Sequence, residues 1–349
     1  MNKICLIGNS GSNKYPYNGQ CAKVNLYKKK IVDEGFDLDF IDLFYFRAHP
    51  FRILISILKS VKHCQRIVLL TAQNGAKILI PFINLINKKR KPFIFPLIGI
   101  NILHKYIDKL STFDQRAFLL ENKYLEKPSH KDVRNFKKIS LILAENVVVA
   151  NALKNFFGLS NVEVLENFRD CSVLTKKISF DKKLKVIFLS RVCKVKGILD
   201  LLDCITKLQK ENVEICLDIY GQNGLNKLDN EKFYSLLNNN IVYHGPISCN
   251  DVVSTINNYD CFIFPTNYFG EGTPGVISES FIAGVPIISS NFVQAYTILN
   301  DKHDSLIYEQ SNNFELCKYL KKIYFDREYL GFLTKNAHKT ALKFTYDFC

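Results

Sequence analysis

The stretch Cys261–Ser289, CFIFPTNYFGEGTPGVISESFIAGVPIIS, combines a strand, a glycine-rich loop, a helix and the start of a second strand. Its apolar first segment ends at Pro265, which is typical of a buried strand. Thr273 followed by Pro274 predicts an N-cap and a first helical residue. Gly284 can adopt the left-handed conformation that ends a helix, so the chain can enter the next strand. A strand–helix–strand unit of this kind indicates a parallel sheet with helices packed on it.

The same alternation of strand and helix runs through both halves of the chain. In the first half, strands are predicted at Lys3–Gly8, Asp37–Ile41, Arg66–Thr71, Pro92–Leu97, Val147–Ala150 and Val162–Glu166. In the second half, they are predicted at Leu184–Leu189, Ile215–Tyr220, Ile241–His244, Cys261–Pro265 and Pro286–Ser289. Apolar residues at helical spacing fill the segments between strands, for example Gly197–Leu208. The predicted fold class is therefore α/β, with two doubly wound Rossmann-like domains.

The length of 349 residues exceeds one compact core and suits two domains. The polar, aperiodic stretch Phe168–Asp181 predicts the join between them. We expect one domain at 1–170, a second at 171–328, and a final helix within 329–349. The sequence leaves open whether that helix crosses back to the first domain. Two such domains facing each other would leave a cleft at the carboxyl ends of their strands, where ligands of these folds bind.

The cysteine pattern favours a reducing compartment. The eleven cysteines are an odd number, none are spaced C-x-x-C, and several lie in apolar strand-like runs. Small buried residues are the preferred interpretation, over a disulfide framework or a zinc site. The N-terminal segment has a strand pattern rather than that of a signal peptide, and no apolar run predicts a transmembrane helix. A cytoplasmic location is therefore expected.

The net charge of +14 is unevenly distributed. Residues 1–175 carry 27 Lys and Arg against 14 Asp and Glu, whereas residues 176–349 carry 20 against 19. A basic half favours an anionic partner such as a phospholipid surface, a phosphorylated acceptor or nucleic acid. Phe44–Lys62 and Pro81–Lys91 combine basic and apolar residues and could meet the inner face of a membrane. In the alternative interpretation both are ordinary helices packed on the sheet, and the charge is solvated.

Two carboxylates in the opening stretch are candidates for binding hydroxyl groups. Glu271 lies in the glycine-rich loop and Glu279 in the helix, beside apolar neighbours. A helical glutamate is commonly a solvated surface charge. Here the surroundings favour hydroxyl donors over bulk water, and sugars and riboses supply paired hydroxyls. The free N–H groups at the start of the helix are suited to phosphate oxygens.

Glu271 and Glu279, eight positions apart, match the E-x7-E motif, and the whole turn resembles the donor-binding turn of family 4 retaining glycosyltransferases. That resemblance implies the GT-B fold, with an acceptor-side first domain and a nucleotide-sugar-binding second domain. It implies that Glu271 holds the hydroxyls of the transferred sugar and that Glu279 binds the ribose. It also implies backbone contacts to the donor from Gly272, Thr273, Pro274, Gly275 and Val276.

A second segment, VIFLSRVCKVKG, resembles the family's diphosphate-binding loop and assigns that role to Arg191 and Lys196. The chemistry is independent of the family, since fixed cations stabilise the charge that develops on a leaving diphosphate. Ser190 stands where the family usually has glycine. Taken without the glutamate pair, both cations are better interpreted as surface charges.

Weaker similarities extend over almost the whole chain. Gly19 and Gln20 resemble the family's first glycine-rich loop beside the donor phosphates. Position at strand ends suggests a nucleotide-side role for Tyr220, Gly221, Gly245 and Pro246. His104 follows the fourth strand, where several relatives have an acceptor-side polar group, but a lone histidine is more often a surface or core residue.

Other site types are rejected. Asp37 and Asp39 form a D-x-D string, which holds a metal in other glycosyltransferases, but alternation in an early strand places them away from the predicted cleft. Family 4 enzymes generally need no metal, and neither a metal site nor a cofactor is predicted. The nicotinamide fingerprint G-x-G-x-x-G is absent, and no nucleic-acid motif is visible.

The function predicted from the sequence is thus a retaining, metal-independent glycosyltransferase. Its expected donor is a nucleotide diphosphate sugar, with UDP preferred because the family uses it most. Its expected acceptor is a cell-surface polysaccharide or a lipid-linked oligosaccharide. The alternatives are a catalytically idle GT-B subunit that binds a partner, and a nucleotide-sugar 2-epimerase of the same architecture, which lacks this E-x7-E turn.

Overall fold

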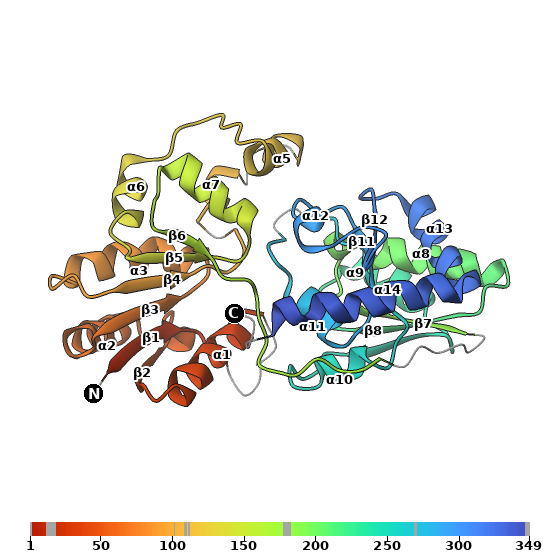
Figure 1. The fold of residues 1–349 in the computed structure, drawn as a ribbon, viewed down its shortest axis with the longest axis horizontal. Helices are drawn as coiled ribbons and strands as arrows, with labels where there is room; N and C mark the ends of the chain where they lie inside the picture. The colour runs from red at the N-terminus through yellow and green to blue at the C-terminus, as the bar shows by residue number, and fades with distance from the viewer. Residues whose placement is uncertain are drawn as a thin grey trace. The chain divides into compact units, whose positions relative to one another are not determined.

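The chain forms two compact units, Met1–Glu166 and Asn167–Cys349 (Figure 1). The computed structural model describes residues 2–11, 19–100, 102–107, 110, 112–176, 183–268 and 271–345, except for the side chains of residues 104, 112 and 113. Within this part of the chain, no helix combines the length and the apolar character needed to cross a bilayer.

The first unit contains a six-stranded parallel sheet with the order β2-β1-β3-β4-β5-β6. Its strands are β1 (Lys3–Gly8), β2 (Asp37–Asp42), β3 (Arg66–Leu70), β4 (Phe93–Pro96), β5 (Leu141–Ala144) and β6 (Val162–Val164). Its helices are α1 (Gly19–Asp33), η1 (Leu43–Tyr45), α2 (Pro50–His63), α3 (Gln73–Ile86), α4 (His104–Ile107), α5 (Thr112–Leu120), α6 (His130–Phe136) and α7 (Val147–Phe157).

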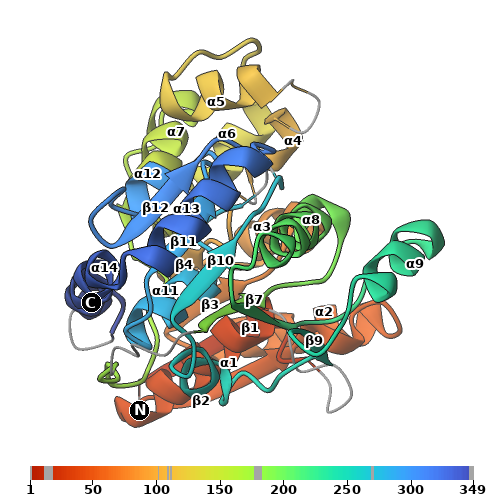
Figure 2. The ribbon, with the colours of Figure 1, turned by 90° about the vertical axis from the view of Figure 1, so that its right-hand side faces the viewer.

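The second unit repeats the design with the strand order β12-β11-β10-β7-β8-β9 (Figure 2). Its strands are β7 (Leu184–Leu189), β8 (Ile215–Tyr220), β9 (Ile241–Gly245), β10 (Cys261–Phe264), β11 (Ile287–Ser290) and β12 (Ser305–Tyr308). Its helices are η2 (Lys194–Lys196), α8 (Ile198–Lys210), α9 (Lys227–Ser235), α10 (Val252–Ile256), α11 (Gly275–Ile282), α12 (Ala295–Ile298), α13 (Asn313–Phe325), α14 (Arg327–Thr340) and η3 (Ala341–Phe344).

Strand order and handedness fix which helices share a face. Crossover connections between parallel strands are right-handed, so the face that a helix covers depends on the direction in which the chain moves across the sheet. In the first unit, α2 leads to β3 and α3 leads to β4, and both connections cross the sheet in the same direction. These two helices therefore share one face of the sheet, opposite α1. In the second unit, α8 and α9 cover one face while α11 and α12 cover the other.

Helix α14 and the turn η3 pack within the second unit. Leu330 and Leu333 join the core on the α8 side of the sheet. Ala337, Ala341 and Phe344 join the core on the α11 side, where the Phe344 ring stacks on Phe281. The helix that the sequence places near the C-terminus therefore contributes to both cores of this unit.

The predicted strand Val147–Ala150 is wrong, because this segment begins helix α7. Three consecutive valines favour a strand by propensity, but Asn146 caps a helix here by accepting from the Val149 amide at 3.0 Å. The helix ends at Gly158, which has φ of 63°. The fifth strand is instead β5, which the sequence analysis missed, together with β12 in the second unit.

Two cysteines depart from the expected pattern of unpaired thiols. Cys204 on α8 and Cys317 on α13 form a disulfide, with their Cα atoms 5.7 Å apart. Cys5, Cys64 and Cys261 are buried and form no disulfide, as a role in packing predicts. Burial raises the pKa of the Cys261 thiol above its ordinary range, which keeps it neutral in the core.

Candidate active site

The strand order of the second unit reverses between β7 and β10. The chain builds outward from β7 to β8 and β9, then returns to place β10 on the other side of β7. In open α/β sheets, the carboxyl ends of the strands at such a reversal form the ligand-binding crevice. The loops that follow β7 and β10 carry the VCKVKG and TNYFGEGTPG segments, so the two motifs that the sequence analysis selected meet here.

Backbone contacts hold these two loops together. The Asn267 amide, after β10, donates to the Val195 carbonyl, after β7, at 2.8 Å. Gly197 has φ of 72°, and a Cβ at this residue would lie 1.9 Å from the Pro265 carbonyl oxygen. Only glycine fits such an approach, because any side chain would collide with backbone that cannot move aside. The start of α8 is thereby held against the end of β10.

This arrangement brings Lys196 and Glu271 into direct contact. Lys196 Nζ donates to Glu271 Oε1, and the two side chains are 12% and 9% exposed. Thr266 Oγ1 donates to the same carboxylate oxygen at 2.8 Å. Lys196 Nζ also lies 4.8 Å from the centre of the Tyr268 ring. A cation and a carboxylate are therefore fixed side by side at the strand ends, with little access for water.

Glu279 is held by a residue that the sequence analysis missed. Arg169 Nε donates to Glu279 Oε1 at 2.8 Å, across 110 positions of sequence. Nη1 of the same guanidinium donates to Asn167 Oδ1 and to the Phe168 carbonyl, each at 3.0 Å. A Cβ on Gly275 would lie 1.9 Å from Arg169 Nη2, so the glycine leaves room for the arginine.

Helix α11 begins one residue later than predicted. Its N-cap is Pro274 rather than Thr273, its first residue is Gly275, and no side chain caps it. Thr273 instead accepts a hydrogen bond at its carbonyl from Asn167 Nδ2, at 3.0 Å. Gly272 and Thr273 are buried, while Pro274, Gly275 and Val276 are half-buried. The first turn of α11 thus presents backbone N–H groups rather than a capping side chain, which suits an anionic group.

The ends of β8 and β9 form a neighbouring polar cluster. Gly221 has φ of 135°, and its amide donates to the Gly245 carbonyl at 2.8 Å. The Tyr220 ring stacks on His244, with centroids 4.6 Å apart. Pro246, the residue after Gly245, is exposed to solvent.

The same cluster continues into the sheet edge. His244 Nε2 lies 2.7 Å from Asp218 Oδ1. Burial raises the pKa of Tyr259 far above its ordinary value, so its phenol stays protonated and donates to Asp218 Oδ2 at 2.9 Å. The Tyr220 hydroxyl lies 3.3 Å from the Tyr259 hydroxyl. This rigid edge places an aromatic surface beside Gly221 and Gly245.

Arg191 takes no part in the Lys196–Glu271 ion pair. It is exposed, and it makes no ion pair with any residue that the structure describes. Its aliphatic portion packs near Gly224, whose Cβ position is 3.7 Å from Arg191 Cδ. The two cations of the VCKVKG segment therefore differ, since Lys196 is held in place while Arg191 is solvated.

The remaining predicted residues belong to the first unit. Gly19 and Gln20 open helix α1, and a Cβ on Gly19 would meet nothing within 4 Å. His104 begins α4, and its side chain lies outside the described part of the chain. The loop before it is ordered by a buried ion pair that the sequence analysis missed. Lys23 Nζ donates to Glu145 Oε1 and to the Leu97 carbonyl, each at 2.8 Å, and Glu145 also accepts from the Gly99 amide.

No cluster suited to a metal ion is found among the described residues. Asp37 and Asp39 lie on edge strand β2, where Lys3 Nζ is 3.9 and 4.0 Å from their carboxylates. Asp39 also accepts from Ser60 Oγ at 2.6 Å. These contacts give the D-x-D string a role in holding the edge of the sheet.

Comparison with known proteins shows the architecture. The structure superposes on that of Anabaena Alr3699/HepE in complex with UDP and glucose, with a TM-score of 0.69 and 14% identity over 99% of this chain and 96% of that one. It superposes equally on sucrose-phosphate synthase from Thermosynechococcus elongatus, with a TM-score of 0.71 and 12% identity over the same shares. The fold is GT-B. The expected fold class is thereby confirmed.

The comparison with a family model concerns the second GT-B unit. Residues 174–340 match the family model "Glycosyl transferases group 1". The uncharacterized glycosyltransferase MJ1069 of Methanocaldococcus jannaschii is 22% identical over 229 residues. That match covers 58% of this chain and 55% of the relative. The Lys196–Glu271 and Arg169–Glu279 pairs lie in or beside the segment that matches the group 1 model.

Proposed function

We propose that this protein is a retaining, metal-independent glycosyltransferase of family 4 that uses a nucleotide diphosphate sugar, with UDP as the nucleotide. The observation that carries the proposal is the buried Lys196–Glu271 pair at the strand-order reversal of the second unit. A donor must be bound by a cation at its diphosphate and by an acceptor of hydrogen bonds at its sugar. This pair supplies both groups in one place.

In the proposed mechanism the donor separates the two partners. Lys196 Nζ leaves the carboxylate and binds the diphosphate, where it stabilises the charge that grows as the glycosidic bond breaks. Glu271 is then free to accept hydrogen bonds from the sugar hydroxyls, while Thr266 keeps its orientation through the 2.8 Å contact. The acceptor attacks from the side of the leaving group, and a donor phosphate oxygen takes its proton. Glu271 orients the sugar and forms no covalent bond.

We assign the ribose to Glu279. Arg169 occupies one side of this carboxylate and fixes its position, and the carboxylate lies on the first two turns of α11. Paired ribose hydroxyls match the two oxygens of one carboxylate. The uncapped first turn of α11, from Gly275, would then bind phosphate oxygens through its amides. Arg191 is solvated in this structure and would have to turn toward the diphosphate to contribute.

The first unit supplies a candidate acceptor pocket. A cavity of about 370 Å³ lies between α3, α4 and α6, where the chain leaves β3 and β4. Its lining combines apolar residues such as Ile80 and Phe136 with the cations Lys77, Lys105 and Lys131. The carboxylate in the lining, Asp132, is already bound by Lys105 at 2.9 Å and by the Tyr106 hydroxyl at 2.6 Å. Cations over an apolar floor suit an anionic acceptor that carries lipid, as in a lipid-linked oligosaccharide.

We also propose that the first unit rests on an anionic membrane surface through α2 and α3. Between residues 43 and 107 the sequence has eleven Lys and Arg and not one Asp or Glu. The helices in this stretch expose large apolar side chains to solvent, namely Phe51 (80%), Ile55 (53%), Ile78 (52%) and Leu85 (72%). Because α2 and α3 share one face of the sheet, these apolar and basic side chains can approach the same lipid surface.

A panel of UDP-, GDP- and ADP-sugars tests the proposed activity. A matching donor at 100 times its dissociation constant should stabilise the protein by about 2.7 kcal/mol in thermal unfolding. The matching donor should then transfer its sugar, or be slowly hydrolysed, with retention at the anomeric carbon as followed by NMR. A donor that binds and is neither transferred nor hydrolysed would indicate an idle binding subunit. An epimerised donor would indicate the 2-epimerase.

A further inference from the structure

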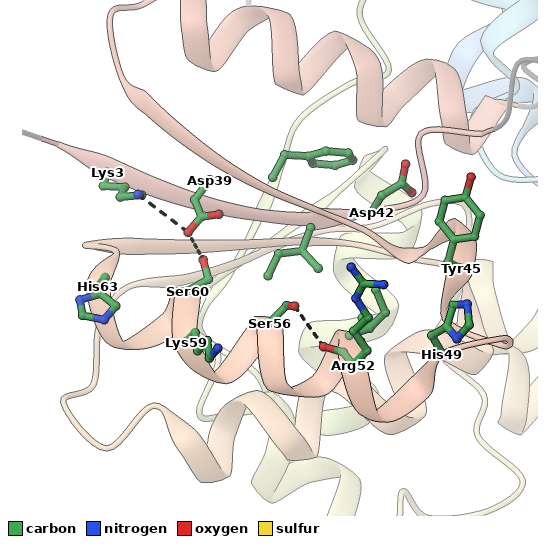
Figure 3. A pocket seen from close by; sticks show the side chains of 13 residues that line it. Lys3, Asp39, Asp42, Tyr45, His49, Arg52, Ser56, Lys59, Ser60 and His63 are labelled. Carbon is green, nitrogen blue, oxygen red and sulfur yellow. Dashed lines mark hydrogen bonds and ion pairs between the residues drawn. The ribbon is translucent and has the colours of Figure 1, made fainter.

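A cavity of about 740 Å³ lies between edge strand β2 and helix α2 of the first unit (Figure 3). It is lined along α2 by residues at helical spacing, namely His49, Arg52, Ser56, Lys59 and His63. Figure 3 shows Arg52 extending from α2 into the space in front of β2. One full side of α2 therefore faces the cavity with basic and hydroxyl groups.

The acids in the cavity are already bound. Asp39 is held by Lys3 and Ser60. Asp42 accepts from Ser10 Oγ and from the Phe44 amide. These contacts hold both carboxylates on β2, and within the described part of the chain neither forms an ion pair with a cation of α2.

The basic residues that α2 contributes to the cavity differ from Lys3, which is paired with Asp39. Within the described part of the chain, no ion pair involves His49, Arg52, Lys59 or His63. The lining carries three permanent cations, Lys3, Arg52 and Lys59, against the two carboxylates of Asp39 and Asp42, so one positive charge is in excess and favours an anion. Arg52 can present a planar pair of donors to phosphate oxygens, and Lys59 adds a point charge.

The exposed apolar residues of α2 lie on the adjacent side of the same helix. Phe51 and Ile55 are one turn apart, and Lys62 continues their row two turns further on. At 3.6 residues per turn, this row is roughly a quarter of a turn from the row formed by Arg52, Ser56 and Lys59. A ligand bound in the cavity therefore has an apolar surface directly beside it.

We propose that this cavity binds the phosphate-bearing headgroup of an anionic lipid, with the acyl chains directed over Phe51 and Ile55. Arg52 and Lys59 bind the phosphate, and Ser56, whose hydroxyl donates to the Arg52 carbonyl at 3.0 Å, accepts from a hydroxyl of the headgroup. The inference rests on the proposed membrane contact of α2 and not on the transferase chemistry of the second unit. It identifies a lipid site separate from the acceptor pocket between α3, α4 and α6, since the two linings share no residue.

The test uses the full chain and a lipid that stays monomeric in solution, dihexanoylphosphatidylglycerol, with binding followed by calorimetry. The double variant Arg52→Gln, Lys59→Gln should bind this lipid at least about 10-fold more weakly, the scale of one charge-assisted hydrogen bond. The matched control Lys88→Gln, Lys89→Gln also removes two exposed cations, from the turn after α3, but none from the cavity. It should bind the monomeric lipid as the unchanged protein does. Equal losses in both variants would overturn the proposal.

Two further arms identify the source of the phosphate and the role of the apolar row. sn-Glycerol 3-phosphate should bind more weakly than the short-chain lipid, because it lacks the chains that contact Phe51 and Ile55. The variant Phe51→Ser, Ile55→Ser should remove that difference. Equal affinity of the unchanged protein for both ligands would overturn the lipid assignment. UDP binding measured on the same samples reports on the second unit, so a failure of the proposed transferase function would be seen separately.

Discussion

Lys196 and Glu271, the proposed site pair, differ in their environment from ordinary surface charges. Both residues of the pair are largely buried, whereas Lys194, two positions before Lys196 in the same turn, is exposed. Composition does not distinguish the two lysines. Their difference arises from the close approach of the loop after β10, which encloses Lys196 only.

Replacing Lys196 with alanine should lower turnover by about 10²–10³, the loss seen when one fixed charge-stabilising group is removed. The buried carboxylate of Glu271 would keep its Thr266 contact but lose its cation. Lys194→Ala is the matched control, with the same change in charge and length, and should leave the rate within about twofold. The measurement is kcat for transfer from the matching donor, with unfolding followed to confirm that both variants fold. Similar rates for both variants would reduce Lys196 to a structural cation.

Glu271→Ala should abolish transfer and leave the affinity for free UDP equal or tighter. Its carboxylate is assigned to the sugar, which UDP lacks, and its removal leaves Lys196 free for the phosphates. Glu279→Ala should show the opposite pattern, with weaker UDP binding, because that carboxylate is assigned to the ribose. Calorimetry with UDP, beside transfer rates, separates the two roles. A loss of UDP affinity in Glu271→Ala would contradict the assignment.

Arg169 shows the limit of sequence reasoning at this scale. The motif residues were predictable because each lies within a few positions of a strand end. Arg169 reaches Glu279 across 110 positions, so no local spacing reveals it. The same holds for Lys23, which pairs with Glu145 across 122 positions. Residues that position the motif become visible only when the fold brings distant segments together.

At the scale of elements, the pattern of apolar residues and the placement of glycines predicted the bounds of most strands to within one or two residues. Two of the exceptions follow from local physics. Val147–Ala150 has strand-like residues but enters a helix because the Asn146 side chain caps its first turn. Strand β12 was missed although β4, β10 and β11, which also have four residues, were predicted. The start of α11 is displaced by one residue because Thr273 turns its carbonyl to Asn167 instead of capping the helix.

Gly197 joins two elements of the second unit, and its replacement should be more costly than that of Gly35, a left-handed glycine with open space around it. Gly197→Ala would place a methyl group 1.9 Å from the Pro265 carbonyl, and Gly35→Ala would meet nothing within 4 Å. Both carry the left-handed cost of about 1–2 kcal/mol. Gly197→Ala should lose roughly 2 kcal/mol more, or about 4–8 °C in the transition of its unit. Thermal unfolding of both variants, followed by calorimetry, makes the comparison. Equal shifts of the unfolding temperature in both variants would mean that the start of α8 and the end of β10 can move apart to accept the methyl group.

At the scale of the whole molecule, charge follows the division into units. The sequence alone showed that the excess of basic residues lies in the first half. The structure adds that α2 and α3 share a face and that this face also exposes Phe51 and Leu85. It also separates Lys91 from its neighbours in the basic run. Lys91 Nζ donates to the Val61 and Lys62 carbonyls at 2.7 and 2.9 Å, so it holds the carboxyl end of α2.

If the α2–α3 face rests on lipid, the protein should sediment with phosphatidylglycerol vesicles and not with phosphatidylcholine vesicles. Binding should fall steeply between low salt and ~0.5 M, because salt screens exposed charges. Reversing Lys88, Lys89 and Arg90 to glutamate should weaken binding by several kcal/mol, at about 1 kcal/mol per basic residue removed near the surface. Lys91 is left unchanged, since its loss would disturb α2.

The matched control reverses three exposed lysines of the second unit, Lys210, Lys227 and Lys335, which alters the net charge equally. It should leave vesicle binding nearly unchanged if the contact is made by one face. Binding that ignores salt, or that both triple variants weaken to the same extent, would show that the basic excess acts only through overall charge. A soluble anionic acceptor would then be the better explanation of the lysines around the α3–α6 cavity. The cosedimented fraction at each salt concentration decides between these outcomes, because only a localised contact depends on which unit carries the reversed charges.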